Sequence, residues 1–252
     1  MSSYVRLINR GKIAEIEFFN PAGNSLPSAM LEDLTSRFED LQQLSDVSVV
    51  ILKSGGEKAF CGGASFDELI QISNLEEGKK FFSGFAKVIN AMRKAPQIII
   101  GRIHGKSVGG GIGLACACDY TLGTVHSSIK LSELAVGIGP FVVGPAIERK
   151  AGRAAFVELA LQPAEWKSAQ WAFQKGIFQY LAESISELDQ KIDELAGQLV
   201  EYNPEALAEL KKIFWQNTED WDTLLLQRAE ISGKLVLSDF TKAFIVKFKN
   251  KQ

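Results

Sequence analysis

The sequence predicts an α/β fold followed by a helical C-terminal region. Segments with the period of a strand alternate with segments that have the period of a helix, up to about residue 141. Beyond that residue the helical period dominates. The chain has 252 residues, of which 46% are hydrophobic, and this is enough to bury one large core. We therefore expect one α/β unit that carries a helical appendage.

The first predicted elements are a hairpin and a helix. Residues 4–19 alternate polar and apolar side chains on either side of Gly11, as the two strands of a hairpin do. A turn at Asn20-Pro21 precedes a helical pattern over 30–41. The elements expected next are a buried strand over 47–52, a helix over about 75–94, a strand over 97–103, a helix over 110–117 and a strand over 119–125.

The last third of the chain is expected to be helical. Apolar residues recur at helical spacing over 185–199, and Asn203-Pro204 is a typical helix start, with Asn as the cap and Pro at the first helical position. No linker or low-complexity segment separates this part from the rest. The C-terminal third also carries large apolar residues, among them Phe214, Trp215, Trp221 and Phe240. We expect a partner to cover some of them.

Charge and composition exclude several classes of function. Twenty-eight basic and thirty acidic residues give a formal charge of -2, without a run of like charges, so nucleic acid is not an expected partner. The amino terminus lacks the apolar core of a signal peptide, and no segment approaches the ~18 apolar residues of a membrane span. A cytoplasmic protein without a membrane partner is expected. Cys61, Cys116 and Cys118 lack C-x-x-C spacing, which favours buried thiols over a metal or redox site.

The Gly-rich stretch GKSVGGGIGL at 105–114 resembles a phosphate-binding loop but fails the spacing tests. Only three residues separate Gly101 from Gly105-Lys106-Ser107, where a P-loop needs four. A dinucleotide fingerprint needs Gly or Ala at a position that Leu114 or Cys116 occupies. What remains is a triple glycine at a helix start, where backbone N–H groups point outward. The alternative is that these glycines only permit tight packing.

A second Gly-rich loop, KAFCGGAS at 58–65, also follows a buried strand. Two such loops can bring one amide each to a single oxygen and stabilise an enolate. Together with GKSVGGGIGLACACD at 105–119, SELAVGIGP at 132–140 and AFIVKFK at 243–249, this pattern resembles the crotonase (enoyl-CoA hydratase/isomerase) superfamily. The resemblance implies a crotonase-like spiral of strand-strand-helix turns over 1–190. It also implies a helical region over 191–252 that serves oligomerisation and the CoA site.

The resemblance assigns binding roles to particular residues. It places the two oxyanion amides on Ala64 and Gly110. The residues that it places along the acyl-CoA site are Ala64, Ser65, Phe66, Asp67 and Gly110, with Phe244 and Lys247 near the CoA adenosine and phosphates, often across a subunit boundary. A core Phe and a solvated Lys are the alternatives for the last two. No separate cofactor is implied, because CoA is part of the acyl-CoA substrate.

The acid–base residues depart from the family pattern. Hydratases of the family carry a Glu two residues after the glycine triplet, and this chain has Gly113 there. The second family Glu matches Glu133, with Ser132 in place of Pro. One carboxylate suits a proton shuttle between C2 and C4 of an enoyl thioester. We expect apolar walls formed by Leu134, Val136, Ile138 and Phe141 to raise the pKa of Glu133. An exposed loop acid is the alternative.

These roles predict an acyl-CoA enzyme that isomerises a double bond, with hydration or decarboxylation as other outcomes of the same enolate. A catalytically weak acyl-CoA-binding subunit is an alternative of a different class. His104 and His126 lack a neighbouring nucleophile pattern, which disfavours a catalytic triad. Asp67 and Glu68 could supply a substitute acid, or they could complement a helix dipole. The family resemblance further implies a homotrimer or homohexamer.

Overall fold

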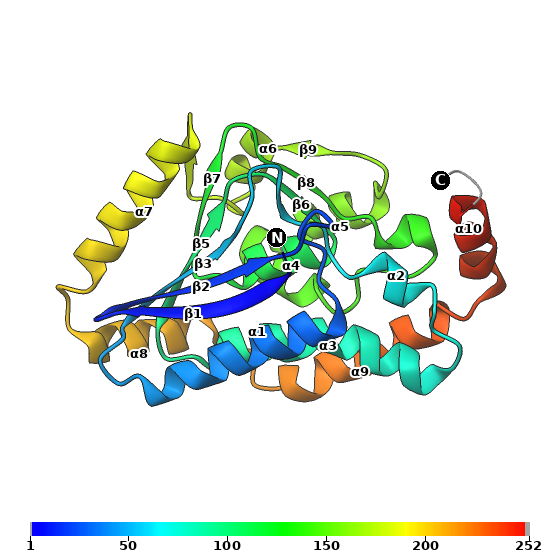
Figure 1. Ribbon diagram of the computed structural model, residues 1–252, viewed down its shortest axis with the longest axis horizontal. Coiled ribbons are helices and arrows are strands. Elements are labelled where there is room, and N and C mark those ends of the chain that lie inside the picture. Colours follow the sequence, from blue (N-terminus) through cyan, green and yellow to red (C-terminus); the bar gives the residue numbers. More distant parts are fainter. Residues whose placement is uncertain (1, 250–252) are drawn as a thin grey trace.

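The computed structural model describes residues 2–249, with side chains described as far as residue 247. Within these residues the strands form two sheets (Figure 1). The larger, six-stranded sheet has the order β1 (Tyr4–Arg10), β2 (Ile13–Phe19), β3 (Val49–Ser54), β5 (Ile98–Ile103), β7 (Tyr120–Thr124) and β10 (Tyr180–Ala182). The smaller, four-stranded sheet has the order β4 (Ala59–Cys61), β6 (Lys106–Val108), β8 (Ser128–Lys130) and β9 (Lys167–Ser168).

The chain winds through the two sheets as a spiral. Each turn gives one strand to the large sheet, the next strand to the small sheet, and then a helix. The successive turns are β3–β4 with α2 (Phe66–Leu69) and α3 (Leu75–Lys94), β5–β6 with α4 (Gly110–Ala117), and β7–β8 with the 3₁₀ turn η2 (Glu133–Val136) and α5 (Gly144–Leu161). The predicted spiral of strand-strand-helix turns is confirmed. It places the segments that follow β4, β6 and β8 beside one another.

Continuous apolar runs form the central strands because both faces of the large sheet are covered. Val50 and Ile99 pair in register and belong to the main core, while Val49 and Ile51 face a second cluster. Helix α7 (Ile185–Leu199) covers that second face, as the yellow helix in Figure 1 shows. Parallel strands that are buried on both sides are expected to be uniformly apolar. This burial explains why the sequence of β3 does not alternate.

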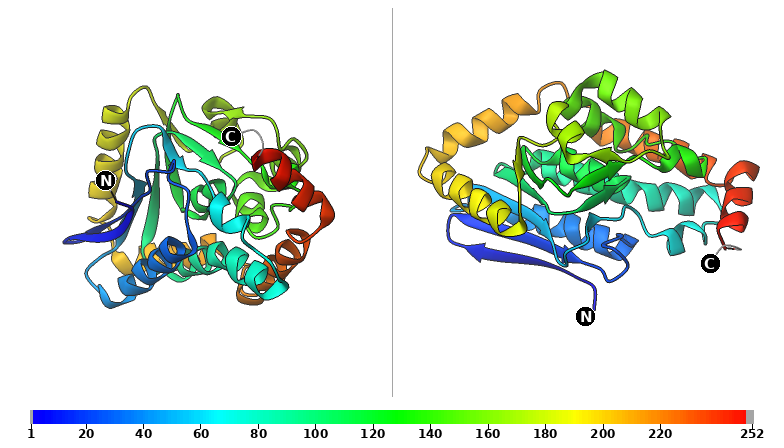
Figure 2. Two further views of the ribbon diagram at one scale, coloured as in Figure 1. Left: turned by 45° about the vertical axis from the view of Figure 1, so that its right-hand side comes forward. Right: turned by 90° about the horizontal axis from the view of Figure 1, so that it is seen from above.

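The remaining helices flank the sheets. They are α1 (Ser28–Asp40), η1 (Leu41–Gln43), α6 (Ala169–Gln174), α8 (Pro204–Phe214), α9 (Trp221–Leu235) and α10 (Asp239–Lys249). Helices α1, α3 and α9 lie side by side, and α10 lies at the far end of the molecule beside α2 (Figures 1 and 2). Helices α3 and α9 approach closely, since a Cβ on Gly78 would lie 2.7 Å from the Gly233 carbonyl oxygen. The predicted helical C-terminal region is confirmed.

Two details differ from the sequence-based expectations. Strands continue beyond residue 141, because β9 and β10 add short edge strands, and neither is long enough to show a period of two. Trp215 and Trp221 do not need a partner to cover them. Both are buried, in an edge-to-face contact with ring centroids 5.7 Å apart. By contrast, Phe214 and Phe240 remain exposed.

Helix α8 is anchored to the core by a buried ion pair. Lys211 Nζ lies 3.0 Å from Asp119 Oδ2, and Trp215 Nε1 donates to Asp119 Oδ1 at 2.7 Å. Asp119 Oδ2 also accepts from the Ile99 amide at 2.8 Å. Asp119 therefore has a structural hydrogen-bonding role. The three cysteines are buried as free thiols, and no helix in residues 2–249 is both long and apolar enough to cross a membrane.

Candidate active site

A cavity of about 190 Å³ lies where the two Gly-rich loops meet η2. Its walls come from four parts of the chain: the 62–69 loop and α2, the face of α3 that carries Phe82 and Phe85, the start of α4, and the segment 132–143. Ser232 of α9 contributes one more contact. The spiral brings these parts together. Three of the walls follow strands β4, β6 and β8 of the small sheet, and the fourth, α3, packs against α4. Most of the lining is apolar.

The two Gly-rich loops touch each other at the cavity. Gly63 has φ +88°, and a Cβ there would lie 2.9 Å from the Val108 carbonyl oxygen and 3.6 Å from the Gly110 nitrogen. A Cβ on Gly111 would lie 2.5 Å from the Cys61 carbonyl oxygen. These contacts exclude a side chain, so the glycines are required for the close approach. The loops that carry Ala64 and Gly110 are thus held in direct contact.

Ala64 is held with its amide free. Leu26 pairs with it in a parallel bridge, in which the Leu26 amide donates to the Gly63 carbonyl at 2.7 Å and the Ser65 amide donates to the Leu26 carbonyl at 3.1 Å. This pattern uses the groups on either side of Ala64 and turns its own N–H away from Leu26. Within residues 2–249, neither the Ala64 amide nor the Gly110 amide donates a hydrogen bond. Both residues line the cavity, which leaves two backbone donors available to a ligand oxygen.

Gly110 also lies under an aromatic ring. A Cβ at this position would be 2.2 Å from Cζ of Phe85, a residue of α3 that lines the cavity. The sequence predicted a helix over about 75–94, but it did not show that Phe82 and Phe85 of α3 reach the site. The signal that could have found them is the absence of a side chain at Gly110, which leaves room for a large neighbour.

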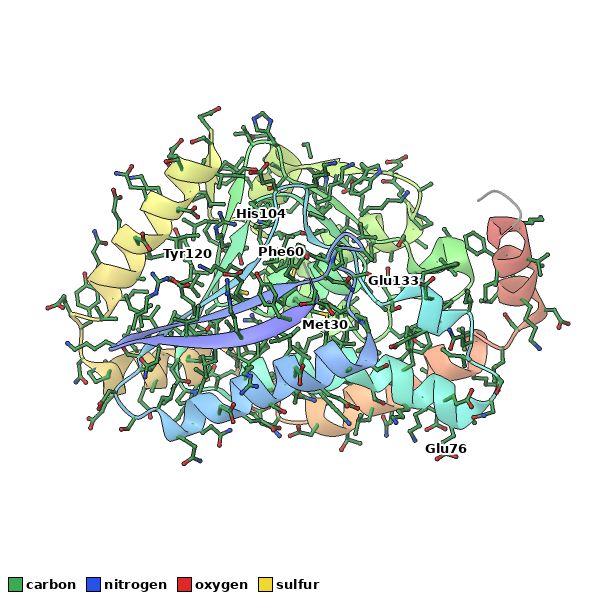
Figure 3. All side chains as sticks on the ribbon, viewed as in Figure 1. Met30, Phe60, Glu76, His104, Tyr120 and Glu133 are labelled. Carbon is green, nitrogen blue, oxygen red and sulfur yellow. The ribbon has the colours of Figure 1, made fainter. Side chains whose placement is uncertain are left out.

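Glu133 is the acid of this cavity. It begins η2, where the Ile138 amide donates to the Glu133 carbonyl at 3.0 Å and Gly137, with φ +87°, closes the turn. The Oε2 oxygen is buried and has no hydrogen-bond partner within residues 2–249. Burial in this apolar surrounding raises the pKa of Glu133 from 4.5 to about 7. Figure 3 shows Glu133 on the side of the molecule that carries α2 and α10.

The expected walls around Glu133 are mostly present. Val136, Ile138 and Phe141 line the cavity. Leu134 does not, because it lies on the outward side of the 3₁₀ turn and is 44% exposed. The prediction for Leu134 is therefore wrong, and Pro140, Val142 and Val143 complete the wall instead.

Among the other residues predicted near the Gly-rich loop at 58–65, some line the cavity and others do not. Phe66 lines it. Ser65 is buried and caps α2, where its Oγ accepts from the Glu68 amide at 3.4 Å. Asp67 is exposed and does not line the cavity. Glu68 turns toward Ser28, whose amide and hydroxyl donate to Oε2 at 2.9 and 2.7 Å, so it is engaged as the cap of α1.

Phe244 and Lys247 lie on α10, outside the residues that line the cavity. Phe244 is half-buried and Lys247 is exposed. Their contacts with CoA, which the family resemblance implies, stay a prediction. No group of three or more His, Cys, Asp or Glu side chains in residues 2–249 is placed to hold a metal ion.

His104 lies apart from the cavity. Figure 3 shows it toward the α7 side of the molecule, away from Glu133. Its Nδ1 is 3.0 Å from an Arg102 guanidinium nitrogen, and burial together with the Arg102 charge lowers the pKa of His104 to about 4. A neutral histidine beside an arginine has no nucleophile to activate, in agreement with the absence of a triad pattern.

Comparison with known proteins finds enoyl-CoA hydratases among the relatives and structural neighbours of this chain. A probable enoyl-CoA hydratase of Bacillus subtilis (strain 168) is 27% identical over 242 residues, which cover 95% of this chain and 93% of that protein. The short-chain-enoyl-CoA hydratase of Clostridium acetobutylicum is 27% identical over 251 residues, or 98% of this chain and 95% of that protein. The enoyl-CoA hydratase of Bacillus halodurans shares the fold, with a TM-score of 0.90 at 19% identity over 97% of this chain and 100% of that chain.

The family itself is matched over almost the whole length. The sequence model described as Enoyl-CoA hydratase/isomerase matches residues 9–243, which include both Gly-rich loops and Glu133. With that match, the chain belongs to the enoyl-CoA hydratase/isomerase family and is an acyl-CoA-processing enzyme.

Proposed function

We propose that this enzyme isomerises the double bond of an enoyl-CoA, with Glu133 as the single proton shuttle. The observation that carries the proposal is that Glu133 is the one titratable side chain among the described residues that line the cavity. Glu133 takes a proton from C2 of a 3-enoyl thioester, and the electrons form a dienolate. Protonation at C4 by the same carboxyl group then gives the 2-enoyl thioester, and Glu133 is ionised again.

The electrostatics of the cavity support this role. A group that must act first as a base and then as an acid works best when its pKa lies near the working pH. Burial brings the pKa of Glu133 to about 7. The free amides of Ala64 and Gly110 suit the thioester oxygen, where negative charge develops in the dienolate. The reaction needs no group other than the CoA thioester itself, so we propose that no further cofactor is used.

Hydration is the second candidate, because the relatives just described are named as hydratases. Adding water across the C2–C3 bond normally employs one group to activate the water and another to manage the proton at C2. The family position for one of these two carboxylates is Gly113. The absence of a second carboxylate among the described cavity residues therefore favours isomerisation.

Decarboxylation and simple binding fit the cavity less well. A substrate with a second carboxylate requires a cation or several donors at that group, because a buried unpaired charge is costly. No Lys, Arg or His lines the cavity within residues 2–249, and the Glu133 carboxylate would repel such a substrate. A protein that only binds acyl-CoA has no use for a buried carboxyl group with a raised pKa beside two free amides.

We also propose self-association as a homotrimer or homohexamer. Ile213, Phe214 and Phe240 are 56%, 46% and 66% exposed, and such large apolar side chains favour coverage by another subunit. In such an assembly Phe244 and Lys247 would serve the CoA site of the same subunit or of a neighbour. The expected cytoplasmic location, and the expected division of the chain at residue 190, stay predictions.

The test of the proposed reaction is proton exchange. The enzyme is incubated with 3-enoyl-CoA and 2-enoyl-CoA of several chain lengths in deuterated water, and deuterium at C2 and C4 is followed by mass spectrometry together with the position of the double bond. Isomerisation predicts exchange at both carbons and interconversion of the two substrates. Exchange at C2 with formation of only 3-hydroxyacyl-CoA would favour hydration. Neither interconversion nor exchange with any chain length would favour binding alone.

A further inference from the structure

The structure shows what occupies the place of the missing second carboxylate. Gly113 is buried on α4 and does not line the cavity. A Cβ built on Gly113 would lie 2.5 Å from Cγ1 of Val143 and 2.8 Å from its Cβ. Cβ atoms essentially never lie within 3.0 Å of another heavy atom, so Val143 and a side chain at 113 cannot both keep these positions. Val143, unlike Gly113, lines the cavity.

The backbone fixes Val143 in this position. It is the residue that precedes α5, with φ −86° and ψ −18°, and its carbonyl accepts the Ile147 amide at 3.2 Å. Only 4% of the residue is exposed, and α5 packs along α4. The side chain can therefore not swing away to admit a group at 113 without moving the start of a helix. A β-branched residue is also restricted in χ1, which limits its freedom further.

The consequence for chemistry is a wall that cannot hold or activate water. An ordered water needs about two to four polar partners. The polar side chains that line the described cavity are Ser132, Glu133 and Ser232, and at Val143 the wall presents methyl groups instead. Resting on the isomerase function proposed above, we propose that Val143 determines the outcome of the reaction. Its side chain fills the place of a water-activating group, so that the dienolate is protonated to the enoyl thioester and no water is activated to add at C3 of that product.

The test combines substitutions at the two positions. Val143→Gly removes both atoms that lie within 3.0 Å of the Gly113 Cβ position and leaves the nearest backbone atom, Cα, at 3.6 Å. Glycine is acceptable at a residue that precedes a helix. The control is Val142→Gly, since Val142 is also a buried valine on the same wall but is not among the nearest neighbours of Gly113.

Activity and stability are measured separately. In Gly113→Glu/Val143→Gly, we expect the ratio of hydration to isomerisation to rise by about 100-fold, the lower end of what a positioned acid–base group contributes. Gly113→Glu alone, or combined with Val142→Gly, should lower the melting temperature and gain no hydration. Gly113→Ala tests the steric claim without adding a charge. It should destabilise the wild-type protein strongly and the Val143→Gly protein much less.

The two proposals fail in different ways. If the wild-type enzyme does not interconvert 2- and 3-enoyl-CoA, the isomerase function fails, while the stability coupling between residues 113 and 143 still tests the steric claim. The role of Val143 is overturned if the wild type isomerises but the ratio of hydration to isomerisation is the same in Gly113→Glu/Val143→Gly and in the control Gly113→Glu/Val142→Gly. Additive effects of Gly113→Ala and Val143→Gly on the melting temperature would overturn it as well.

Discussion

The carboxylate of Glu133 packs directly against the α-carbon of Gly109: a Cβ at residue 109 would lie 2.9 Å from Oε1 and 3.4 Å from Oε2. Gly109 has φ +51° and immediately precedes the free amide of Gly110. The proposed proton-transfer group and one of the two proposed oxyanion donors thus both adjoin a single residue. This relationship explains why a glycine is needed at 109.

Replacing Glu133 by Gln should remove exchange at C2 and C4. The amide has nearly the shape of the carboxyl group but cannot take a proton, so we expect a loss of about 10²–10⁴-fold in turnover. Binding of acyl-CoA, measured by calorimetry, should change little. Asp67→Asn is the matched control, because Asp67 is an exposed acid that does not line the cavity. Equal losses in the two variants would remove Glu133 from its assigned role.

The pH dependence of the wild type should report the same group. Abstraction of a proton needs ionised Glu133, whose pKa burial raises to about 7. We therefore expect kcat/KM for isomerisation to rise with pH on its acidic limb and to level off above a pH near 7. An acidic limb near pH 4.5, the ordinary value for Glu, would mean that the acid in use is exposed to solvent.

Burial of Glu133 should also cost stability above neutral pH. The folded-state pKa of about 7 lies above the value of 4.5 for the unfolded chain. Between these two pH values the folded state therefore retains a proton that the unfolded chain has lost. Stability is therefore complete below pH 4.5 and falls as the pH rises to about 7, by about 3 kcal/mol in total. Chemical denaturation at pH 4, 6 and 8 checks this. Glu133→Gln should lack this part of the decline, and identical pH profiles for the two proteins would contradict it.

The α/β alternation and the helical C-terminal region were predictable from the residues because their signals were long or repeated, whereas the spiral of strand-strand-helix turns was implied by the family resemblance. The apolar run of β3 and the helical period of α7 each extend over several residues, and burial on both faces of the large sheet leaves a clear pattern. Edge strands such as β9 have two residues and carry no period. The burial of Trp215 was not predictable either, since its hydrogen-bond partner, Asp119, is distant in the sequence. Trp221 in turn packs edge-to-face on Trp215.

The site was predictable only in part. The positions of Ala64, Gly110 and Glu133 were predictable from motifs, because glycines and an acid at fixed spacing can be recognised in the sequence. Phe85 and Val143 belong to no such motif, and the sequence pattern of an apolar residue is the same in a core and in a cavity wall. Their roles emerge only from contacts with Gly110 and Gly113. In both cases a glycine marks the place where a side chain from elsewhere in the chain enters.

Replacing Ala64 by proline should separate the contribution of the backbone amide to turnover from that of the side chain. Ala64→Pro removes the N–H but leaves the two hydrogen bonds of the Leu26 bridge, which use the Gly63 carbonyl and the Ser65 amide. Loss of one oxyanion donor elsewhere costs about 10²–10³ in kcat. Ala64→Gly keeps the N–H and should retain most of the turnover. For both variants, kcat and the affinity for acyl-CoA are measured. Normal turnover in a folded Ala64→Pro protein would show that this amide is not an oxyanion donor.

Self-association should depend on the exposed apolar residues of α8. Sedimentation of the purified protein should give a mass near three or six times 27.6 kDa. Ile213 and Phe214 are 56% and 46% exposed, so Ile213→Ser/Phe214→Ser should leave the fold intact but shift the mass toward the monomer. Leu161→Ser is the comparison, because Leu161 is 69% exposed on α5. A monomeric wild type at micromolar concentration would contradict the assembly, and a shift caused by Leu161→Ser alone would place the interface on α5 instead.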